Sequence, residues 1–206
     1  MMILTAPSSA ELVIRNSRFL AEALPVATQE DARHILKERK DKYNDATHVV
    51  HAFIVGETGG ILGCSDDGEP AGTAGRPVLE VLKGSDITNI IITVTRWFGG
   101  IKLGTGGLVK AYTQAAQAVL DGASIIPLVK VRGFSVTLPY DVYEAVKRGI
   151  VSLDGEIFTE VFDTNVSLTG QLPEEAAPSL CSLVRDLTRG SVAVVLQEEN
   201  QTGQKV

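Results

Sequence analysis

Residues 89–120, NIIITVTRWFGGIKLGTGGLVKAYTQAAQAVL, are the stretch of sequence that decides the fold. The stretch opens with β-branched residues from Ile90 to Thr95, and a run of this kind suits a strand that is buried on both faces. Five glycines follow between Gly99 and Gly107, and beyond them apolar residues recur at helical spacing as far as Leu120. The stretch therefore predicts a strand, a glycine-rich loop and a helix, in that order.

The glycine-rich loop is the first candidate binding site. A loop that leads into a helix points free backbone N–H groups at a ligand over the helix N-terminus, where the macrodipole favours an anion. Basic residues and an aromatic residue able to stack on a base lie along the same segment. The candidate anion or nucleic-acid contacts are Arg76, Arg96, Trp97, Gly99, Gly100, Lys102, Gly104, Thr105, Gly106, Gly107 and Lys110.

A structural interpretation of the same glycines stands beside the functional one. Glycine allows a tight turn to reach positive φ, and it allows a helix to pack closely on a strand. The spacing matches neither the phosphate-loop pattern, which ends in Gly-Lys-Ser/Thr, nor a Gly-x-Gly-x-x-Gly directly after the strand. On the pattern alone, both interpretations remain open.

A second informative stretch, SDDGEPAGTAGRP at residues 65–77, contains the carboxylates Asp66, Asp67 and Glu69. Carboxylates are ligands that Mg²⁺ prefers, and they also act as catalytic acids or bases, with His48 as a weaker candidate for that role. The third interpretation is that they pair with basic residues and fix two loops against each other. The expected partners are Arg76, Arg96, Lys102 and Lys110. We prefer this interpretation for two of the three carboxylates, so we expect no cofactor, with Mg²⁺ or phosphate as the alternative.

Composition restricts the class of protein. A hydrophobic fraction of 44% with 21% charged residues indicates a globular chain able to bury a core. No apolar run approaches the roughly 20 residues of a membrane span, and the N-terminus lacks the basic and apolar segments of a signal peptide. Cys64 and Cys181 have no Cys or His partners at metal-ligand spacing, which favours two reduced thiols in a cytoplasmic protein.

The charge balance bears on nucleic-acid binding. The net charge is −6: residues 1–128 hold 12 basic and 14 acidic residues, a net −2, and the remainder holds 7 and 11, a net −4. A non-specific nucleic-acid binder usually shows a basic face or a high pI. Contact with RNA would therefore need a local basic patch, and nothing in the sequence indicates specific binding to DNA.

Periodicity predicts two domains, at residues 1–127 and 128–206. In the first, strands are expected at 11–15, 18–26, 48–55 and 90–95, and helices at 29–43, 78–82 and from about 108. Thr28 and Asp31 resemble a capping box for the helix at 29–43, which we expect to form a solvated outer layer. His48 and His51 are three apart in a strand, so they point to opposite faces and cannot share a metal.

The second domain has an order of elements that is typical of the ferredoxin-like fold. Its expected elements are a strand at 129–138, a helix at 140–153, strands at 156–162 and 165–172, a helix from 173 to about 189, and a strand at 191–196. The polar tail from about residue 197 is expected to fray. No catalytic constellation occurs in this domain, which leaves a docking or RNA-contacting module, or a domain that only stabilises the chain.

The motifs SDDGEPAGTAGRP and ITVTRWFGGIKLGTGGLVKAY closely resemble the signature of the IMPACT/YigZ family. NSRFLAEALPV and DATHVVHAF fit it as well, so the resemblance covers residues 11 to about 125. Trp97 stands where this family usually has Tyr, which keeps the capacity to stack. Val49 and Val50 stand where a polar residue and Cys are commoner, so a role that depends on that Cys does not transfer.

The resemblance implies a fold for each domain. The first resembles the α/β superfold, of α+β type, that is shared by domain IV of elongation factor G, a small-subunit ribosomal protein domain and the GHMP kinases. In that superfold two helices cover one side of a sheet, and one βαβ crossover is left-handed, against the strong right-handed rule. The second domain of bacterial members resembles domain V of elongation factor G, which is ferredoxin-like.

The resemblance also implies a field of function. The eukaryotic relatives act in translational control by competing for a partner of the kinase that senses amino-acid starvation. Some bacterial members have carried a proline-dipeptidase label, which the sequence does not support because no set of metal ligands has the spacing that such an enzyme needs.

Three functional hypotheses follow. The preferred one is a regulator without catalysis that binds the ribosome, RNA or a translation factor through the glycine-rich basic loop. The alternative is an enzyme or binding protein for a small phosphorylated or nucleotide ligand, with Mg²⁺ as an optional cofactor. A protein-interaction module is the third, and the sequence does not separate it from the first.

Overall fold

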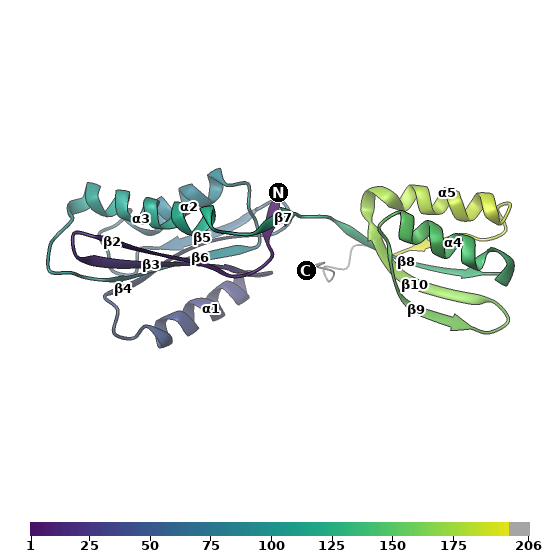
Figure 1. Ribbon diagram of the computed structural model, residues 1–206, viewed down its shortest axis with the longest axis horizontal. Helices are drawn as coiled ribbons and strands as arrows, with labels where there is room; N and C mark the ends of the chain where they lie inside the picture. Colours follow the sequence, from purple (N-terminus) through teal and green to yellow (C-terminus); the bar gives the residue numbers. More distant parts are fainter. Residues whose placement is uncertain (198–206) are drawn as a thin grey trace. The chain divides into compact units, whose positions relative to one another are not determined.

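The computed structural model describes residues 1–197, and the polar tail that follows lies outside the described residues. The chain divides into two compact units, Met1–Leu128 and a second unit that begins at Val129 (Figure 1). Each unit has its own sheet and its own hydrophobic core. The expectation of a frayed tail from about residue 197 concerns residues outside the described part.

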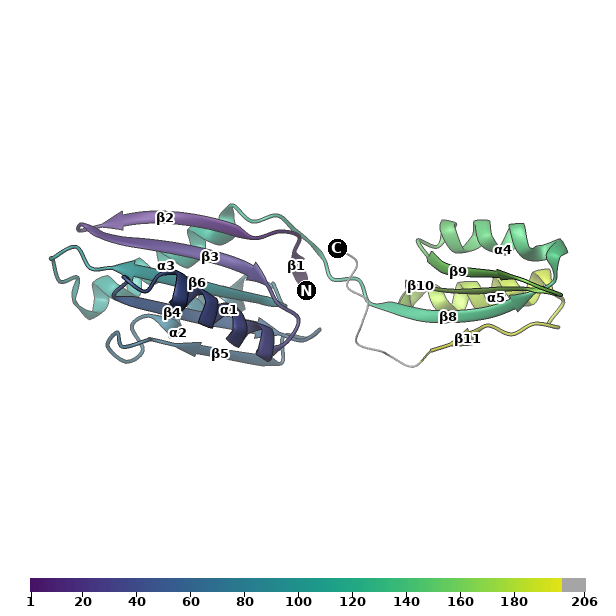
Figure 2. The same cartoon turned by 90° about the horizontal axis from the view of Figure 1, so that it is seen from below.

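The first unit contains a five-stranded antiparallel sheet. Its strands are β2 (Ser8–Ile14), β3 (Ser17–Pro25), β4 (His48–Val55), β5 (Ile61–Ser65) and β6 (Ile90–Trp97). The order across the sheet is β2-β3-β6-β4-β5, which Figure 2 shows from the side of the N-terminal helix. β6 lies in the middle and its residues Ile90 to Arg96 are buried, as its β-branched sequence predicts.

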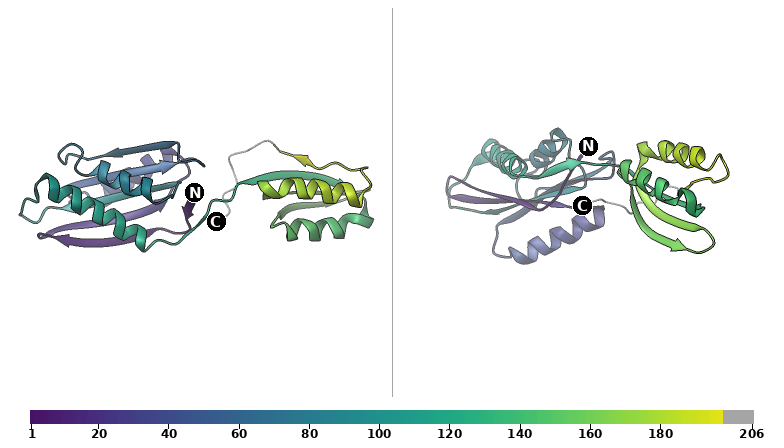
Figure 3. Two further views of the ribbon diagram at one scale, coloured as in Figure 1. Left: turned by 90° about the horizontal axis from the view of Figure 1, so that it is seen from above. Right: turned by 45° about the vertical axis from the view of Figure 1, so that its right-hand side comes forward.

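Helices cover both faces of this sheet. α2 (Gly75–Gly84) and α3 (Gly104–Asp121) lie side by side on one face (Figure 3), and the main core, including Phe19 and Tyr112, lies beneath them. α1 (Gln29–Lys42) lies on the opposite face. Its predicted capping box is present, since Thr28 and Asp31 exchange hydrogen bonds. α1 is more than a solvated layer, because it packs on the sheet through Ala32 and closes a smaller core there.

The topology of the sheet requires one left-handed crossover. β3-α1-β4 and β5-α2-β6 each connect two parallel strands that flank one antiparallel strand. The two connections run across the sheet in opposite directions, along strands of opposite sense, and their helices lie on opposite faces. A half-turn about the sheet normal superposes the strand paths and leaves the helices on opposite faces, so the two crossovers have opposite hands. One of them breaks the right-handed rule, as the resemblance implies.

The structure differs from the sequence-based elements at a few places. The short strands β1 (Met2–Leu4) and β7 (Ile125–Pro127) pair with each other, and three residues are too few to give a recognisable pattern. α3 begins at Gly104 instead of after Gly107. Glycine has low helix propensity and no side chain, so the first turn leaves no periodic signal.

The second unit has the expected ferredoxin-like order. Its elements are β8 (Val131–Leu138), α4 (Tyr140–Ser152), β9 (Glu156–Phe162), β10 (Val166–Pro173), a 3₁₀ turn (Glu174–Ala176), α5 (Ala177–Leu187) and β11 (Val195–Leu196). The sheet order is β11-β8-β10-β9, and α4 and α5 pack on one face around a core that includes Phe134, Leu168 and Leu180 (Figure 1). The last strand has two residues instead of the predicted six. Among the described residues, no helix combines the length and apolar character that a membrane span requires.

Candidate nucleic-acid interface

Asp66 stabilises the start of α2. Its Oδ1 accepts hydrogen bonds from the backbone N–H groups of Ala74 (3.0 Å) and Gly75 (2.8 Å), and its Oδ2 accepts one from Gly72 (2.8 Å). Partial burial alone would raise the pKa of Asp66, but the three N–H donors outweigh it and hold the pKa below its ordinary value. Asp66 is therefore used to fold the 66–75 loop onto the helix N-terminus.

Asp67 connects the same loop to α1 and β4. Its Oδ2 accepts a hydrogen bond from the backbone N–H of Val49 (2.7 Å), and its Oδ1 forms an ion pair with Lys40. Its carbonyl oxygen lies 2.7 Å from Nδ1 of His48. The expected role of fixing loops is present here, with Lys40 as a partner that the sequence-based argument did not include.

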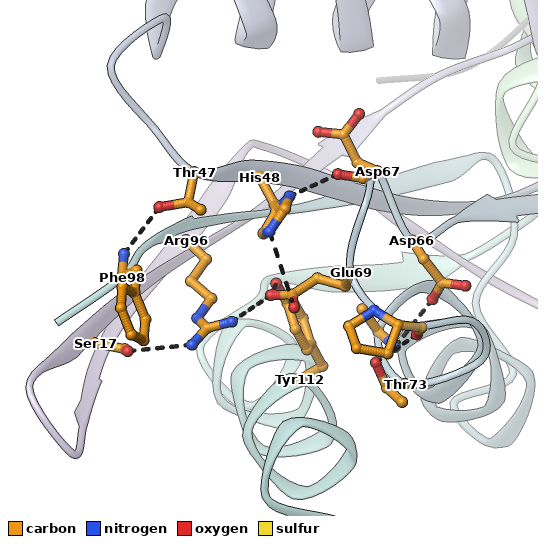
Figure 4. A network of polar contacts seen from close by, with 12 residues as sticks. Ser17, Thr47, His48, Asp66, Asp67, Glu69, Thr73, Arg96, Phe98 and Tyr112 are labelled. Carbon is orange, nitrogen blue, oxygen red and sulfur yellow. Dashed lines mark hydrogen bonds and ion pairs between the residues drawn. The ribbon is translucent and has the colours of Figure 1, made fainter. Parts of the chain in front are cut away.

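Glu69 is the centre of a buried polar network (Figure 4). Nη1 of Arg96 donates to its Oε1 at 2.6 Å, and the hydroxyl of Tyr112 donates to the same oxygen at 2.8 Å. Nε2 of His48 lies 3.9 Å from its Oε2. Burial, reinforced by the charge of Glu69, raises the pKa of Tyr112 far above its ordinary value. The network joins the 66–75 loop to β6, α3 and β4.

The three carboxylates do not converge on a common point. One caps a helix, one binds Lys40 and one binds Arg96 inside the core. In the part of the chain that the structure describes, no group of three His, Cys, Asp or Glu side chains is arranged to hold a metal ion. The arrangement favours the interpretation in which the acids fix loops over the one in which they bind Mg²⁺.

Two of the expected nucleic-acid contacts have internal partners. Arg96 is only 5% exposed and its guanidinium also approaches Oγ of Ser17 at 3.4 Å, so it supports the loop from beneath instead of presenting charge at the surface. Trp97 donates from Nε1 to Asp45 (3.0 Å), and Arg18 covers its ring at 3.7 Å. Sequence reasoning placed both at the binding surface because it could not see these partners.

The glycine-rich loop packs against the β2–β3 hairpin. The N–H of Gly99 donates to Oγ of Ser17 (3.2 Å), and a Cβ at Gly99 would lie 2.0 Å from the carbonyl oxygen of Asn16. Arg15 and Asn16 form the hairpin turn with positive φ, 45° and 63°, as a two-residue hairpin connection requires. Hereafter, the tip means the hairpin residues 13–17, the loop 98–103 and the first two turns of α3.

The first turn of α3 is open at the tip. No side chain caps it, and a Cβ at Gly106 would meet nothing within 4 Å. Gly100 and Gly104 have φ of 84° and 73°, so both interpretations of the glycines hold at different positions: some permit the turn, and one leaves the helix N-terminus uncovered. Thr105 and Gly106 are exposed there.

A hollow of about 390 Å³ lies beside this turn. Its lining residues are Ile14, Arg15, Leu103, Gly107, Lys110, Ala111 and Gln114. Arg15, Lys102 and Lys110 are exposed, and none of the three has an ion-pair partner within the described residues 1–197. Phe98 and Ile101 are each 47% exposed on the adjoining loop.

The residues that the sequence predicted as anion or nucleic-acid contacts lie in separate parts of the first unit. Lys102, Lys110 and the loop glycines belong to the tip, and Arg15 joins them although sequence reasoning missed it, because only the fold brings the hairpin to the loop. Arg76 is not among them. It lines a separate groove of about 690 Å³ between α2 and α3, together with residues such as Val81 and Gln117.

Two family models match the chain. The Impact N-terminal domain matches residues 15–120, and a domain of unknown function, DUF1949, matches residues 136–191. IMPACT family member YigZ of Escherichia coli (strain K12) is 32% identical over 200 residues, which are 96% of this chain and 98% of the relative. The chain belongs to the IMPACT family.

One solved structure gives the same assignment of the fold. A crystal structure described as that of an hypothetical protein is 31% identical, has a TM-score of 0.69, and is covered to 98% by 97% of this chain. The two-domain translational regulator Yih1 is 28% identical over 58% of this chain and 46% of its own, with a TM-score of 0.35. This IMPACT family chain is similar to YigZ of Escherichia coli over 96% of its length.

Proposed function

We propose that this IMPACT family protein regulates translation without catalysis, by binding RNA of the ribosome through the tip. Membership of the IMPACT family supports the field of function, since a related solved structure is described as that of the two-domain translational regulator Yih1. The observation that carries the RNA contact is the set of unpaired cations, Arg15, Lys102 and Lys110, beside an uncapped helix N-terminus.

The acidic net charge does not oppose this proposal at short range. Charges separated by more than a Debye length, about 10 Å at 0.1 M salt, are largely screened. The carboxylates of the 66–75 loop, Asp66, Asp67 and Glu69, are already occupied by backbone N–H groups, Lys40 and Arg96. A phosphate that approaches the tip therefore meets mainly the cations and the free N–H groups of α3.

The shape of the tip suits unpaired nucleotides. Lysine, arginine and helix N-termini contact phosphate oxygens, and exposed aromatic or apolar side chains receive unstacked bases. Phe98 lies on the same loop as Lys102 and is 47% exposed, with the Arg96 guanidinium 5.5 Å from its ring centroid, whereas Trp97 is covered by Arg18. The expected target is a single-stranded loop or bulge of RNA.

Co-sedimentation with ribosomes and with isolated subunits tests the proposal. We expect Lys102→Ala/Lys110→Ala to weaken binding by about tenfold or more at moderate salt and to reduce the slope of log K against log salt by about 1 to 2. Arg33→Ala/Lys37→Ala is the matched control, because it removes the same charge from exposed residues of α1 on the opposite face.

Two results would contradict the proposal. In the first, both double variants weaken binding equally, which would indicate a general charge effect. In the second, no co-sedimentation occurs at any salt concentration.

The hollow also favours a second candidate function, binding of a small phosphorylated ligand. Its volume of about 390 Å³ falls within the range of small-molecule sites, roughly 300–1,000 Å³. Thermal shift with nucleotides and inorganic phosphate separates the two candidates. Stabilisation by a nucleotide that Lys110→Ala abolishes, without ribosome binding, would favour the small ligand.

A further inference from the structure

The outer strand of the second unit, β9, is a free sheet edge. In the described residues β9 pairs only with β10 and is the last strand of its sheet. An edge strand presents a row of unpaired backbone N–H and C=O groups that another chain is able to use. Three large apolar side chains on it are exposed: Phe158 (59%), Val161 (52%) and Phe162 (57%).

Neighbouring side chains extend this apolar edge. Tyr140 of α4 is 53% exposed, and its ring stacks beside Phe162 with centroids 6.5 Å apart. The pairing of β9 with β10 shifts between Thr169 and Gly170, so Phe158 has no paired residue on β10. From Thr159 to Phe162 the strand is regularly paired on its inner side and free on its outer side.

The charges along the edge are acidic. Glu156 begins β9 and Asp163 follows its last residue, and neither has a cationic partner among the described residues. Between them, Glu160 forms an ion pair with Lys147 at 2.7 Å. The hydroxyl of Tyr143 donates a hydrogen bond to Glu160 and accepts one from Lys147. No lysine or arginine occurs within residues 154–163.

Together, the free edge, the exposed apolar side chains and the acidic residues indicate which kind of strand would pair with β9. Two copies of the chain that paired antiparallel through β9 would bring like charges together, since Glu156 and Asp163 mark opposite ends of the strand, and facing like charges destabilise a strand pair. Acidic residues alone would protect an edge, but protection does not require the exposed Phe158, Val161 and Phe162. The geometry points to a partner strand with apolar and basic residues.

We propose that β9 accepts a basic, extended peptide segment of a partner protein as an additional strand of the sheet. Backbone hydrogen bonds to the free edge supply affinity, and side chains at alternate positions supply specificity. Val161 and Phe162 point to opposite faces of the sheet, so the apolar residues of the segment lie beside Phe162 on the helix-covered face, and its lysines or arginines lie on the other face beside Glu156 and Asp163. The proposal concerns the second unit and does not depend on RNA binding at the tip.

Fluorescence anisotropy of a labelled peptide of about eight residues, the length of a typical strand, tests the proposal on the full chain. The probe alternates lysine or arginine with valine. One comparison peptide replaces its cations by glutamate, and another carries a central proline, which removes a backbone donor. We expect the cationic peptide to bind and both comparison peptides to bind at least about tenfold more weakly.

Variants locate the site. Glu156→Lys/Asp163→Lys and Val161→Lys should each weaken binding of the cationic peptide by about tenfold or more, because each adds positive charge on the face that receives the lysines or arginines. Ile61→Lys is the control, since Ile61 is an equally exposed apolar strand residue, 52%, in the first unit and should leave binding unchanged. Amide shifts in NMR spectra of the full chain should concentrate at residues 156–163.

The proposal is overturned if the cationic peptide does not bind, if the proline peptide binds equally well, or if the shifted amides lie elsewhere. It is also overturned if sedimentation equilibrium shows a dimer that Val161→Lys dissociates, because the occupant is then a second copy. Circular dichroism of each variant confirms that a loss of binding does not arise from unfolding.

Discussion

Glu69 and Arg96 form a buried ion pair that supports the stability of the fold only while both partners are present. Their side chains are 4% and 6% exposed, Tyr112 donates a further hydrogen bond to Glu69, and Ser17 accepts one from Arg96. Removing one partner of such a pair leaves the other charge buried without compensation, which costs more than the pair itself contributes. The pair lies directly under the loop that carries Phe98 and Lys102, so it holds the tip in place.

Glu69→Ala should therefore lower the free energy of unfolding of the first unit by about 3–5 kcal/mol in urea denaturation. Glu80→Ala removes a carboxylate from an exposed pair, in which Glu80 is 56% and Lys83 is 44% exposed, and should cost less than about 1 kcal/mol. The double variant Glu69→Leu/Arg96→Met should lose less than the sum of its single losses. Equal losses for Glu69→Ala and Glu80→Ala would show that the network is not a buried support.

His51 gives the stability of the first unit a dependence on pH. Burial lowers its pKa, and the charge of Lys40 adds to this effect while Asp67 opposes it. The unfolded chain, with an ordinary histidine pKa of 6.5, binds the proton more readily than the folded chain. The contribution of His51 to stability is complete above that value and decreases as the pH falls below it.

His51→Gln should then flatten the loss of stability between about pH 7.5 and about pH 5.5 relative to the original chain, as measured by urea midpoints. His34→Gln, at a side chain that is 73% exposed on α1, is the control for the loss of a histidine as such. A His51→Gln profile parallel to that of the original chain would contradict this role.

At the level of elements, the loop between β6 and α3 contains glycines with different tasks. Gly99 allows the loop to touch the hairpin backbone, and Gly106 leaves the first turn of α3 uncovered. Contact with the hairpin therefore sets the position of the loop. The N-terminus of α3 is open because position 106 holds glycine, although there is room for a larger side chain. Sequence patterns alone treat the two glycines alike.

Gly99→Ala should destabilise the first unit by about 1–3 kcal/mol, because its Cβ would meet the Asn16 carbonyl oxygen at 2.0 Å. Gly106→Ala should stabilise it by about 0.4–1 kcal/mol, because a Cβ there meets nothing and alanine restricts the unfolded chain. Urea denaturation measures both values. Changes of the same sign in the free energy of unfolding at the two positions would show that the two glycines do not have different roles.

At the scale of the whole molecule, the two hydrophobic cores are built from different parts of the chain. Ile92 is fully buried in the core of the first unit, and Leu168 is fully buried in that of the second. The single tryptophan, Trp97, belongs to β6, so its fluorescence reports on the first unit alone. Far-ultraviolet circular dichroism reports on both units.

Leu168→Ala should cost the second unit about 2–5 kcal/mol, leave the Trp97 fluorescence transition in place, and move part of the circular dichroism transition to lower urea. Ile92→Ala should move the fluorescence transition instead. A fluorescence transition that moves equally in both variants would show that the chain unfolds as one cooperative unit.

The sequence by itself determined most of the elements and their order. The β-branched run at 90–95, the capping box at Thr28 and the β-α-β-β-α-β pattern of the second unit all express local periodicities or contacts between near neighbours, so they are visible without a fold. The two motifs also carried the family resemblance. The starts of α2 and α3 were placed several residues late, since glycine and proline leave no periodic signal there.

Only the tertiary structure decided which charges are available. Arg96 meets Glu69 across 27 positions of sequence, Tyr112 meets it across 43, and Gly99 meets Ser17 across 82. Whether a charged residue is buried with a partner or exposed without one depends on such long-range contacts, which no local pattern records. The sequence therefore indicated a basic glycine-rich loop, and the fold moved Arg96 beneath it and placed Arg15 beside it.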